Sequence, residues 1–440
     1  MTVRILHFSD IENAYNDAER LGRLAGSIEA LRDERTLVVG TGDDVGPSIL
    51  SIVTDGRQAI DFFEHVRPDA STFGNHDLDY GIEALLEVVE RSPQTWVCAN
   101  ARRNGVAFGA DAGIVPSAVV EAGGRRIGVF GLLDPETPAV TPPSVDIEVT
   151  DPIEAARDAV DSLRERGVDH VVALAHIQGI DDLARSVDVD VILAGHVHSE
   201  RIDRVGGTLI TRPGAGGRRL VEVTFEDGSW AARTHEVEAG PLDEELETVF
   251  EQRLPEEYRR VLADIDRSDA GTAVDGELED DLPERIVAEA YRWATGADVG
   301  IQHSGGINDG SRFAGEVTAA DLVGVVPYQD PVVAVSISGD ELLNVVRSED
   351  GFGLGGYMSG ISVERRDGAV VDVLIGGEPI DPDASYTLAT TEFFLESEDG
   401  LGSLDGSRRI ESTAGSQYDV LIEYVEQVGV DPESISALEV

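Results

Sequence analysis

The feature that most constrains the fold of this chain is a set of five short apolar segments in its first half, each of which ends in residue types that bind metal ions. The segments end in the following groups: Ser9-Asp10, Gly42-Asp43, Asn75-His76-Asp77, His176, and His196-Val197-His198. In α/β proteins, ligand sites form at the carboxyl ends of the strands. Residues from five distant segments can therefore converge on one site.

Amphipathic stretches of helical length separate these apolar segments. The predicted helices are the stretches 18–32, 81–91 and 152–166. The predicted strands include 36–39, 170–174 and 189–193. Alternation of strands with helices is typical of an α/β domain, and we predict this fold class for residues 1–238.

A change in composition after residue 238 indicates a second unit. The segment 239–274 is acidic, follows a helical pattern to about residue 267, and ends in a stretch rich in Gly and Asp. We therefore expect a helical connector there. Residues 275–440 combine helical patterns with strands such as 331–337, which predicts a C-terminal α+β domain.

The charge of the chain limits the partners that it can bind. It has 85 acidic and 34 basic residues, and its formal net charge is -51. Such a charge repels nucleic acid and acidic lipid, so we expect neither as a partner. All the basic residues are arginine, because the sequence contains no lysine. This pattern favours a halophilic adaptation, in which exposed carboxylates keep the surface hydrated, over an acidic surface shaped by the substrate.

Cysteine usage and hydropathy bear on the location of the protein. Cys98 is the single cysteine, so the chain has neither a disulfide framework nor a thiolate zinc site. The first residues lead directly into a predicted strand without the features of a signal peptide. No segment approaches the length of about 18 consecutive apolar residues that a membrane helix needs. We expect a cytoplasmic protein with no membrane partner, and the sequence indicates no oligomeric state.

The residue types at the five segment ends suit a pair of divalent ions. Carboxylate and amide oxygens combined with imidazole nitrogens bind Mn, Zn, Fe or Co. Two ions about 3.5 to 4 Å apart need a bridging ligand, and Asp43 is the natural candidate for it. Glycines precede Asp43, Asn75 and His196, where the backbone must approach the ions closely. A single Gly-Asp or Asn-His pair could be an ordinary turn, but the whole set favours a binuclear site.

In this order the motifs resemble those of the metallophosphoesterase superfamily, and the second half of the chain resembles its 5′-nucleotidase and UDP-sugar hydrolase branch. The resemblance implies a metallophosphatase-type α/β sandwich followed by a C-terminal nucleotidase domain that binds the substrate. It implies that one ion is held by Asp10, Asp43 and His198. It implies that the other ion is held by Asp43, Asn75, His176 and His196.

The resemblance also assigns catalytic roles, and it shows one departure. His76 matches the catalytic histidine of the family, and Asp79 matches its orienting partner. The family has Asp-x-His at the first strand, whereas this chain has Asp10-Ile11-Glu12. Glu12 is a candidate ligand that would favour Mn or Mg over Zn at the first ion. The alternative is that Glu12 faces solvent and that water completes the shell.

The second half holds the candidate substrate-binding residues. Residues 302–308 resemble the family's substrate loop, but Asn308 stands where the family has arginine, and Arg312 is the candidate for a second family arginine. Tyr357 and Phe393 match the family's aromatic pair, which can stack on a nucleobase. Asp399 could accept hydrogen bonds from ribose hydroxyls. The alternative for Phe393 and its neighbour Phe394 is an ordinary core position.

These features predict a two-metal phosphomonoesterase of the 5′-nucleotidase type that hydrolyses nucleoside monophosphates to nucleoside and phosphate, with Mn favoured. A 2′,3′-cyclic nucleotide phosphodiesterase, a UDP-sugar hydrolase or another phosphoesterase would use the same metals on a different small substrate. A third possibility is a nucleotide-binding protein with a degraded metal site, which the presence of Glu12 favours and the six matching metal and catalytic residues oppose.

Overall fold

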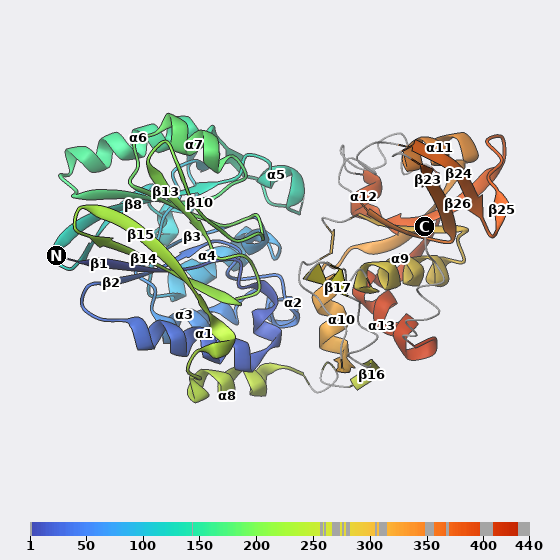
Figure 1. Cartoon of the computed structure of the whole chain (residues 1–440), viewed down its shortest axis with the longest axis horizontal. Coiled ribbons are helices and arrows are strands. Elements are labelled where there is room, and N and C mark those ends of the chain that lie inside the picture. The colour runs from blue at the N-terminus through green and yellow to red at the C-terminus, as the bar shows by residue number, and fades with distance from the viewer. Residues whose placement is uncertain are drawn as a thin grey trace. The chain divides into compact units, whose positions relative to one another are not determined.

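The computed structural model describes residues 2–142, 144–255, 258, 261–265, 273–274, 277–278, 282–303, 306–307, 315–347, 356–366, 369–396 and 408–429. The chain divides into two compact units, Met1–Leu254 and Pro255–Val440. Each unit has its own sheets and helices, as Figure 1 shows. The units are described separately.

Two six-stranded sheets form the middle of the N-terminal unit (Figure 1). The first has the order β15 (Ser229–Glu236), β14 (Arg219–Glu226), β1 (Val3–Phe8), β2 (Thr36–Thr41), β3 (Ala70–Thr72) and β4 (Thr95–Trp96). The second has the order β12 (Arg201–Val205), β13 (Thr208–Arg212), β11 (Val191–Ala194), β10 (His170–His176), β8 (Arg125–Leu133) and β7 (Ser117–Ala122). In both sheets the central strands run parallel, so their carboxyl ends lie along one edge.

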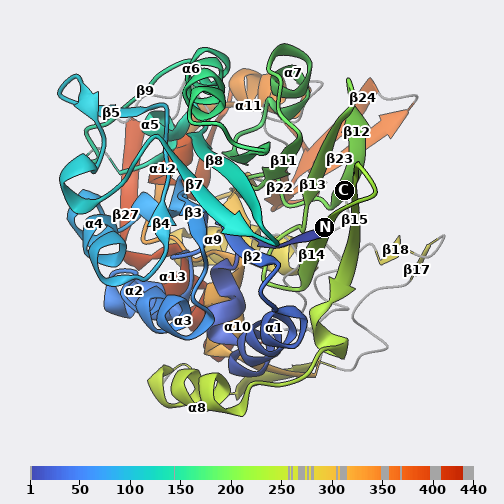
Figure 2. The same ribbon diagram turned by 90° about the vertical axis from the view of Figure 1, so that its left-hand side faces the viewer.

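Helices cover the outer face of each sheet, as Figure 2 shows. The helices α1 (Ala18–Leu31), α3 (Ala59–Val66) and α4 (Ile82–Arg91) contribute to the core on the first sheet. The helices α6 (Pro152–Glu165) and α7 (Ile180–Ser186) contribute to the core on the second. A third apolar cluster fills the space between the sheets. The layers are thus helix, sheet, sheet and helix, and the predicted α/β sandwich is confirmed.

Alternate residues of a strand face opposite sides of its sheet, so one strand contributes to two apolar clusters. In β1, Val3 and Ile5 belong to the cluster between the sheets, whereas Leu6 and Phe8 belong to the cluster under the helices. This is the two-residue period of a strand that is buried on both faces. The same period places the polar side chain of His7 between the sheets.

The three predicted helices of this unit form as α1, α4 and α6. At the start of α6, the side chain of Asp151 accepts a hydrogen bond from the backbone N–H of Glu154, and Pro152 occupies the first turn. Both residues are favourable there, because the first N–H groups of a helix lack internal partners. The shorter elements of the unit are η1 (Glu12–Asn16), α2 (Ile49–Thr54), η2 (His76–Leu78), β5 (Ala101–Arg103), β6 (Val106–Ala107), η3 (Ala110–Ala112), α5 (Thr137–Val140), β9 (Glu148–Val149) and η4 (Val237–Ala239).

The predicted connector 239–274 is helical only in part. Helix α8 (Glu244–Arg253) packs on α1 and belongs to the N-terminal core through Leu246 and Phe250. The expected continuation of the helix to about residue 267 is wrong, because Val261–Ile265 forms strand β16. Pro255 explains the end of the helix, since a residue before proline avoids the helical region, and Leu254 is extended. The predicted domain boundaries themselves stay a prediction.

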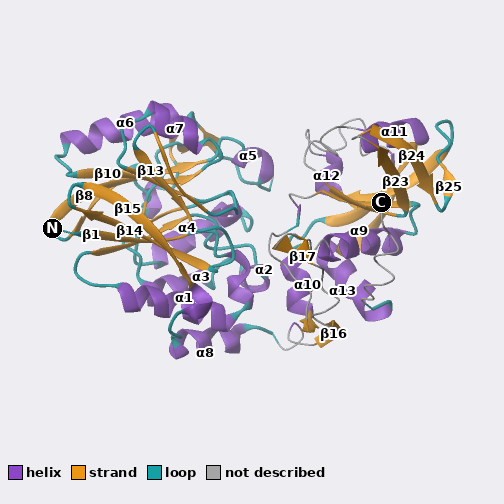
Figure 3. Ribbon diagram, in the orientation of Figure 1, coloured by secondary structure: helices purple, strands orange, loops and turns teal. Residues whose placement is uncertain are grey.

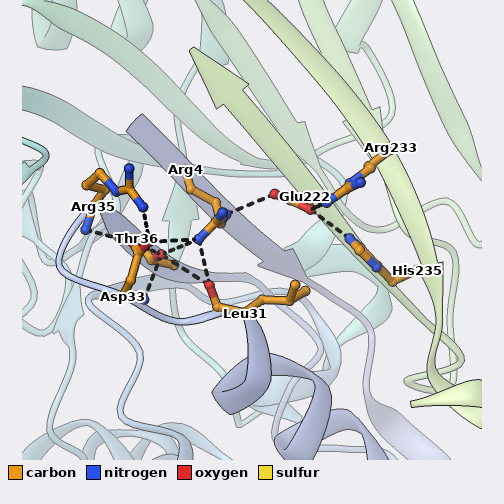
Figure 4. Close-up of polar contacts among 8 residues, drawn as sticks. All are labelled: Arg4, Leu31, Asp33, Arg35, Thr36, Glu222, Arg233 and His235. Atoms are coloured by element: carbon orange, nitrogen blue, oxygen red, sulfur yellow. Dashed lines mark hydrogen bonds and ion pairs between the residues drawn. The ribbon is translucent and has the colours of Figure 1, made fainter. Parts of the chain in front are cut away.

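A polar network lies on the first sheet beyond the end of α1 (Figure 4). The carboxylate of Glu222 is buried and accepts hydrogen bonds from Arg4 Nε at 2.8 Å and Arg233 Nε at 2.7 Å. His235 Nε2 lies 2.8 Å from the same carboxylate. Arg4 also donates to the carbonyl of Leu31, the last residue of α1, at 2.7 Å. The network joins β1, β14, β15 and α1, and its arginines pair with the carboxylate of Glu222.

The C-terminal unit mixes a sheet with helices, as Figure 3 shows. Its five-stranded sheet has the order β22 (Gly356–Ser359), β19 (Val299–His303), β26 (Ser385–Thr391), β21 (Pro331–Ser338) and β27 (Arg409–Ser416). Its longer helices are α9 (Leu282–Thr295), α10 (Ala319–Val325), α11 (Gly339–Arg347) and α13 (Gln417–Gln427). Its remaining elements are β17 (Ala273–Val274), β18 (Glu277–Leu278), β20 (Gly315–Thr318), β23 (Ile361–Arg366), β24 (Ala369–Ile375), β25 (Glu378–Pro379) and α12 (Glu392–Glu396).

The arrangement of these elements fits the predicted α+β class, which is confirmed. Only β19 and β26 pair in parallel in the described part of the sheet, and the other neighbours are antiparallel. Helix α9 packs on β19 and β22, and α13 packs on α9 and α10. Within the described ranges, no helix combines the length and the apolar composition that crossing a membrane requires.

Candidate metal centre

The polar groups predicted at five segment ends lie at the carboxyl ends of five strands. Asp10 follows β1, Asp43 follows β2, Asn75 and His76 follow β3, His176 ends β10, and His196 and His198 follow β11. The structure brings their side chains together in two groups. Within each group the potential ligand atoms lie within 4.8 Å of one another, and the groups are Asp43, His176, His196 and Asp10, Glu12, His198.

His176 is the most informative member of the first group. Its ring is fully buried, and its Nδ1 lies 2.8 Å from the carbonyl oxygen of Thr41. The carbonyl accepts a hydrogen bond from Nδ1–H, so in the neutral ring Nε2 carries a lone pair. Nε2 is buried and lies 3.0 Å from Asp43 Oδ2. A buried nitrogen in this state, facing a carboxylate, fits a metal ligand.

Asn75 adds an oxygen to this group. Its Oδ1 lies 3.1 Å from Nδ1 of His196, so both atoms approach the same point. The His196 and His176 rings are 5.0 Å apart between centroids. Together with Asp43, these residues offer imidazole nitrogens, a carboxylate and an amide oxygen, a donor set that suits a divalent transition metal.

The second group settles the position of Glu12. Its side chain is buried, and its Oε1 lies 3.1 Å from His198 Nε2. Asp10 Oδ1 lies 3.9 Å from the same nitrogen. The alternative that Glu12 faces solvent is therefore wrong. Two carboxylates and one imidazole make this group richer in oxygen than the first.

Four candidate ligands have a left-handed backbone. The φ angles are 50° at Asp10, 44° at Glu12, 52° at Asp43 and 71° at His196. Residues other than glycine rarely adopt this conformation, and each instance costs about 1 to 3 kcal/mol. Such strain persists only where the surroundings enforce it, and it clusters at functional sites.

Two of the glycines that precede the ligands allow a close approach of the loops. Gly42 has a φ of 94°, which favours glycine. A Cβ at Gly74 would collide with Asp43 Oδ1 and with the ring of His176. A larger residue at position 74 would therefore displace Asp43 or His176.

Buried carboxylates dominate the electrostatics of the centre. Burial raises the pKa of Asp10 to about 7. Burial also acts to raise the pKa of Asp43, but the nearby His176 and His76 outweigh it and hold that pKa low. Asp44 is buried with no hydrogen bond to either carboxylate oxygen in the described structure, and burial raises its pKa well above the usual value. Buried carboxylates of this kind need positive charge, so the residues present fit two divalent cations.

The state of His176 leads to the same conclusion. Burial acts to lower its pKa, but Asp43 and Asp10 raise it to about 9. The two carboxylates thus favour a positive charge at the ring of His176. Because a metal ligand must be a neutral imidazole, a bound ion would replace the proton that carries this charge.

His76 and Asp79 form a second arrangement beside the ligands. His76 Nδ1 lies 3.0 Å from Asp79 Oδ2, and the backbone N–H of His76 donates to Asp43 Oδ1 at 2.8 Å. Burial acts to lower the pKa of His76, but Asp79 and Asp43 raise it to about 10. Asp79 thus orients the ring next to the candidate metal groups, and the catalytic role of His76 stays a prediction.

Asp77 makes hydrogen bonds that the sequence did not predict. Its Oδ2 accepts hydrogen bonds from the backbone N–H groups of Gly74 at 2.7 Å and Asp43 at 2.9 Å, and its Oδ1 accepts one from Val45 at 2.7 Å. The carboxylate thereby ties the loop after β2 to the loop after β3. Its place directly after Asn75-His76 was the only signal in the sequence, and it does not reveal this contact.

The candidate substrate residues differ in how far the structure describes them. Asn308, Arg312 and Asp399 lie outside the described residues. Phe394 is fully buried and stacks on His303, with centroids 4.8 Å apart and planes at 3°. Phe393 is 40% exposed, so the core alternative holds for Phe394 and not for Phe393. Tyr357 lies in β22 and is partly exposed.

Comparison with known families agrees with this geometry. Residues 3–200 match the calcineurin-like phosphoesterase family, and residues 264–405 match the 5′-nucleotidase C-terminal domain. The chain is 24% identical over 412 residues to Endonuclease YhcR of Bacillus subtilis (strain 168), with 82% of this chain and 33% of that protein covered. It is 23% identical over 516 residues to the Probable 5′-nucleotidase of Treponema pallidum (strain Nichols), with 91% and 85% covered. The chain spans about a third of the length of its Bacillus subtilis relatives.

Among solved structures, the 5′-nucleotidase precursor from Thermus thermophilus is similar with a TM-score of 0.79. The two chains are 23% identical, and the match covers 98% of this chain and 97% of the other. At this identity the likeness establishes the fold. The family resemblance of the motifs is confirmed, and the chain combines a calcineurin-like metallophosphoesterase domain with a 5′-nucleotidase C-terminal domain.

Proposed function

We propose that this protein is a metal-dependent phosphomonoesterase that hydrolyses nucleoside monophosphates to nucleoside and phosphate. The observation that carries the proposal is the pair of ligand groups at the strand ends, with His76 and Asp79 beside them. The match of the second half to the 5′-nucleotidase C-terminal domain supports a nucleotide as the substrate.

We propose separate roles for the candidate ligands and for His76 and Asp79. Asp10, Glu12 and His198 would hold one divalent ion, Asn75, His176 and His196 the other, and Asp43 would bridge them. When bound, such ions neutralise phosphoryl oxygens and activate water for in-line attack on phosphorus. Asp79 holds the His76 ring through Nδ1, so that the imidazole can stabilise the transition state or protonate the leaving oxygen.

We propose Mn²⁺ as the favoured ion of the oxygen-rich group. Glu12 stands where the family has histidine and is buried beside Asp10 and His198. Harder oxygen ligands favour Mn²⁺ over Zn²⁺. Metal competition on the parent protein and on Glu12→His tests this proposal. We expect the variant to shift its preference toward Zn²⁺, and an unchanged preference would contradict a ligand role for Glu12.

Phe393 supports the assignment of a nucleobase-bearing substrate. Its ring is exposed, while its backbone N–H donates to Asp330 Oδ2 at 2.8 Å and its neighbour Phe394 anchors the segment in the core. An exposed ring on an anchored segment is suited to stacking on a base. We propose that Phe393 provides this contact, together with Tyr357.

A panel of phosphoesters assayed with Mn²⁺ tests the proposed substrate class. The panel would contain AMP, UMP, 2′,3′-cyclic AMP, UDP-glucose and p-nitrophenyl phosphate, with Asp43→Ala as the inactive control. We expect the highest kcat/KM for a nucleoside monophosphate. A higher value for the cyclic nucleotide or the UDP-sugar would favour those alternatives, for which Asn308 in place of the family arginine provides a reason.

We also propose that the protein works in the cytoplasm of a salt-rich cell. The excess of acidic residues and the absence of lysine support the salt-rich part of this proposal. Thermal unfolding measured from low to multimolar KCl tests the salt part of the proposal. We expect the melting temperature to rise over that range, and a fall would contradict the adaptation.

A further inference from the structure

His7 is a buried polar residue in a layer that is otherwise largely apolar. It lies in β1, is fully buried, and points between the two sheets with Val3 and Ile5. Its Nε2 lies 2.8 Å from Thr41 Oγ1, and its Nδ1 lies 3.1 Å from Thr211 Oγ1. Both threonines are fully buried. The ring therefore links β2 of the first sheet to β13 of the second.

The contacts of His7 satisfy the chemistry of a neutral imidazole. One ring nitrogen donates and the other accepts, and each threonine hydroxyl can take either part. Burial lowers the pKa of His7 to about 3, so the ring stays uncharged. A fully satisfied polar link of this kind fixes one arrangement of its neighbours, because any other arrangement leaves a polar group unpaired.

The neighbours of His7 lead to the metal centre. The carbonyl of Thr41 is the group that lies 2.8 Å from His176 Nδ1 and so determines which nitrogen of His176 faces Asp43. Thr41 also precedes Asp43 by two residues, and His7 precedes Asp10 by three. On the other side, Arg212 follows Thr211 and donates to the carbonyl of Ser199, next to His198. One side chain thus contacts two of the strands that carry or support the ligand loops.

We propose that His7 is a positioning residue of the metal centre, which holds the Thr41 peptide in the place that orients His176. The inference rests on the proposed metal centre. Groups behind a metal-binding histidine typically change metal affinity by about 10- to 100-fold when they are lost. We expect the loss to fall mainly on the ion held by Asp43, Asn75, His176 and His196.

The test is calorimetric titration of the metal-free full-length protein with Mn²⁺, in the parent and in His7→Phe. Phenylalanine keeps an aromatic ring, somewhat larger than imidazole, and removes both hydrogen bonds. We expect one of two binding events to weaken about 10- to 100-fold. The matched control is His170→Phe, because His170 is also buried in this unit but packs on Phe225 and Trp230 at the start of β10. We expect unchanged Mn²⁺ affinity in that control.

A double-mutant cycle distinguishes positioning from general damage to the core. Thr41→Val removes the hydroxyl that contacts His7 and keeps the carbonyl that contacts His176. We expect Thr41→Val to weaken the same binding event in the parent and to add little in the His7→Phe background. Both substitutions remove the same hydrogen bond between His7 and Thr41. Thr41→Val also serves as the test if His7→Phe does not fold.

Three outcomes would overturn the inference. The first is a folded His7→Phe with parental affinity for both ions, and the second is an equal loss in His7→Phe and His170→Phe. The third is full additivity of His7→Phe and Thr41→Val. If the parent protein binds no divalent ion, the proposed metal centre is wrong and this inference is wrong with it. If the parent binds two ions and one of the three outcomes above occurs, only this inference is wrong.

Discussion

The N-terminal unit contains two polar clusters built around buried carboxylates, and they differ in how their charge is compensated. In the network of Figure 4, Glu222 contacts Arg4, Arg233 and His235. Burial acts to raise the pKa of Glu222, but these hydrogen bonds outweigh it and lower the pKa. At the carboxyl ends of the strands, burial instead raises the pKa of Asp10 to about 7.

The two clusters differ also in their backbones. Arg4 and Glu222 lie within regular strands, whereas Asp10, Glu12 and Asp43 have left-handed φ angles. A paired network stabilises the fold that surrounds it. A cluster of strained residues around buried carboxylates needs positive charge from elsewhere. We therefore infer that this cluster, and not the paired one, binds cations.

The largest effect should come from removing Asp43, the proposed bridging carboxylate. We expect Asp43→Ala to reduce phosphate release from AMP below detection, because the remaining residues cannot hold both ions. The control at the other cluster is Glu222→Gln, which should keep parental turnover. A turnover near the parental value in Asp43→Ala would contradict the view that the cluster with Asp43 binds metal and that the Glu222 network only stabilises the fold.

The next effect concerns His76, which we propose acts on the substrate and binds no ion. His76→Ala should lower kcat by about 10²- to 10⁴-fold, the usual contribution of a general acid or a transition-state contact. Its metal content, measured by mass spectrometry, should stay at the parental level. Loss of one ion from this variant would move His76 into the ligand set.

A smaller effect extends the comparison to the second unit. Phe393→Ala should weaken AMP binding by about 1 to 3 kcal/mol, the usual value of one stacked base. The variant should hydrolyse p-nitrophenyl phosphate as the parent does, because that ester has no nucleobase. Equal losses of kcat/KM on both substrates would show that Phe393 is structural.

The smallest effect should be one of stability. Glu222→Gln should lower the free energy of unfolding at pH 7 by about 1.5 kcal/mol, the value of a charged hydrogen bond, since the arginine partners reach solvent. Glu226→Gln, an exposed position of the same strand, should change it by less than about 0.5 kcal/mol. Urea denaturation of both variants measures the difference.

The pH dependence of this difference has a definite sign. The pKa of Glu222 is lower in the folded protein than in the unfolded chain, so its contribution is present above the unfolded value. The contribution is lost as the pH falls through the folded value. The gap between the parent and Glu222→Gln should therefore close in acid. A gap that widens in acid would contradict the pairing.

Local patterns in the sequence predicted the parts of the fold that depend on them. Helices α1, α4 and α6 form where amphipathic periods lie, and the polar groups follow strand ends, because both depend on neighbouring residues. The helical pattern after α8 gave a wrong prediction, because Pro255 ends the helix and a strand follows. The pairing of β14 with β1 joins residues far apart in the chain, and no local period encodes it.

For the candidate site too, the sequence predicted the residue types but not their contacts. Residue types and their order indicated the ligand groups, but the burial of Glu12 required the folded chain. The left-handed φ of Asp43 opposes local preference, so no propensity predicts it. The contacts of Asp77 and His7 are made to backbone and hydroxyl groups from distant segments, which a sequence pattern does not display.

The number of divalent ions bound per chain tests the central claim most directly. The measurement is mass-spectrometric metal analysis of chelator-treated protein reloaded with Mn²⁺, together with AMP hydrolysis of the same samples. We expect two ions in the parent and in Glu222→Gln, at most one in Asp43→Ala, and activity that is lost in excess chelator and restored by Mn²⁺. Full hydrolysis by a parent protein that binds no ion would contradict the account.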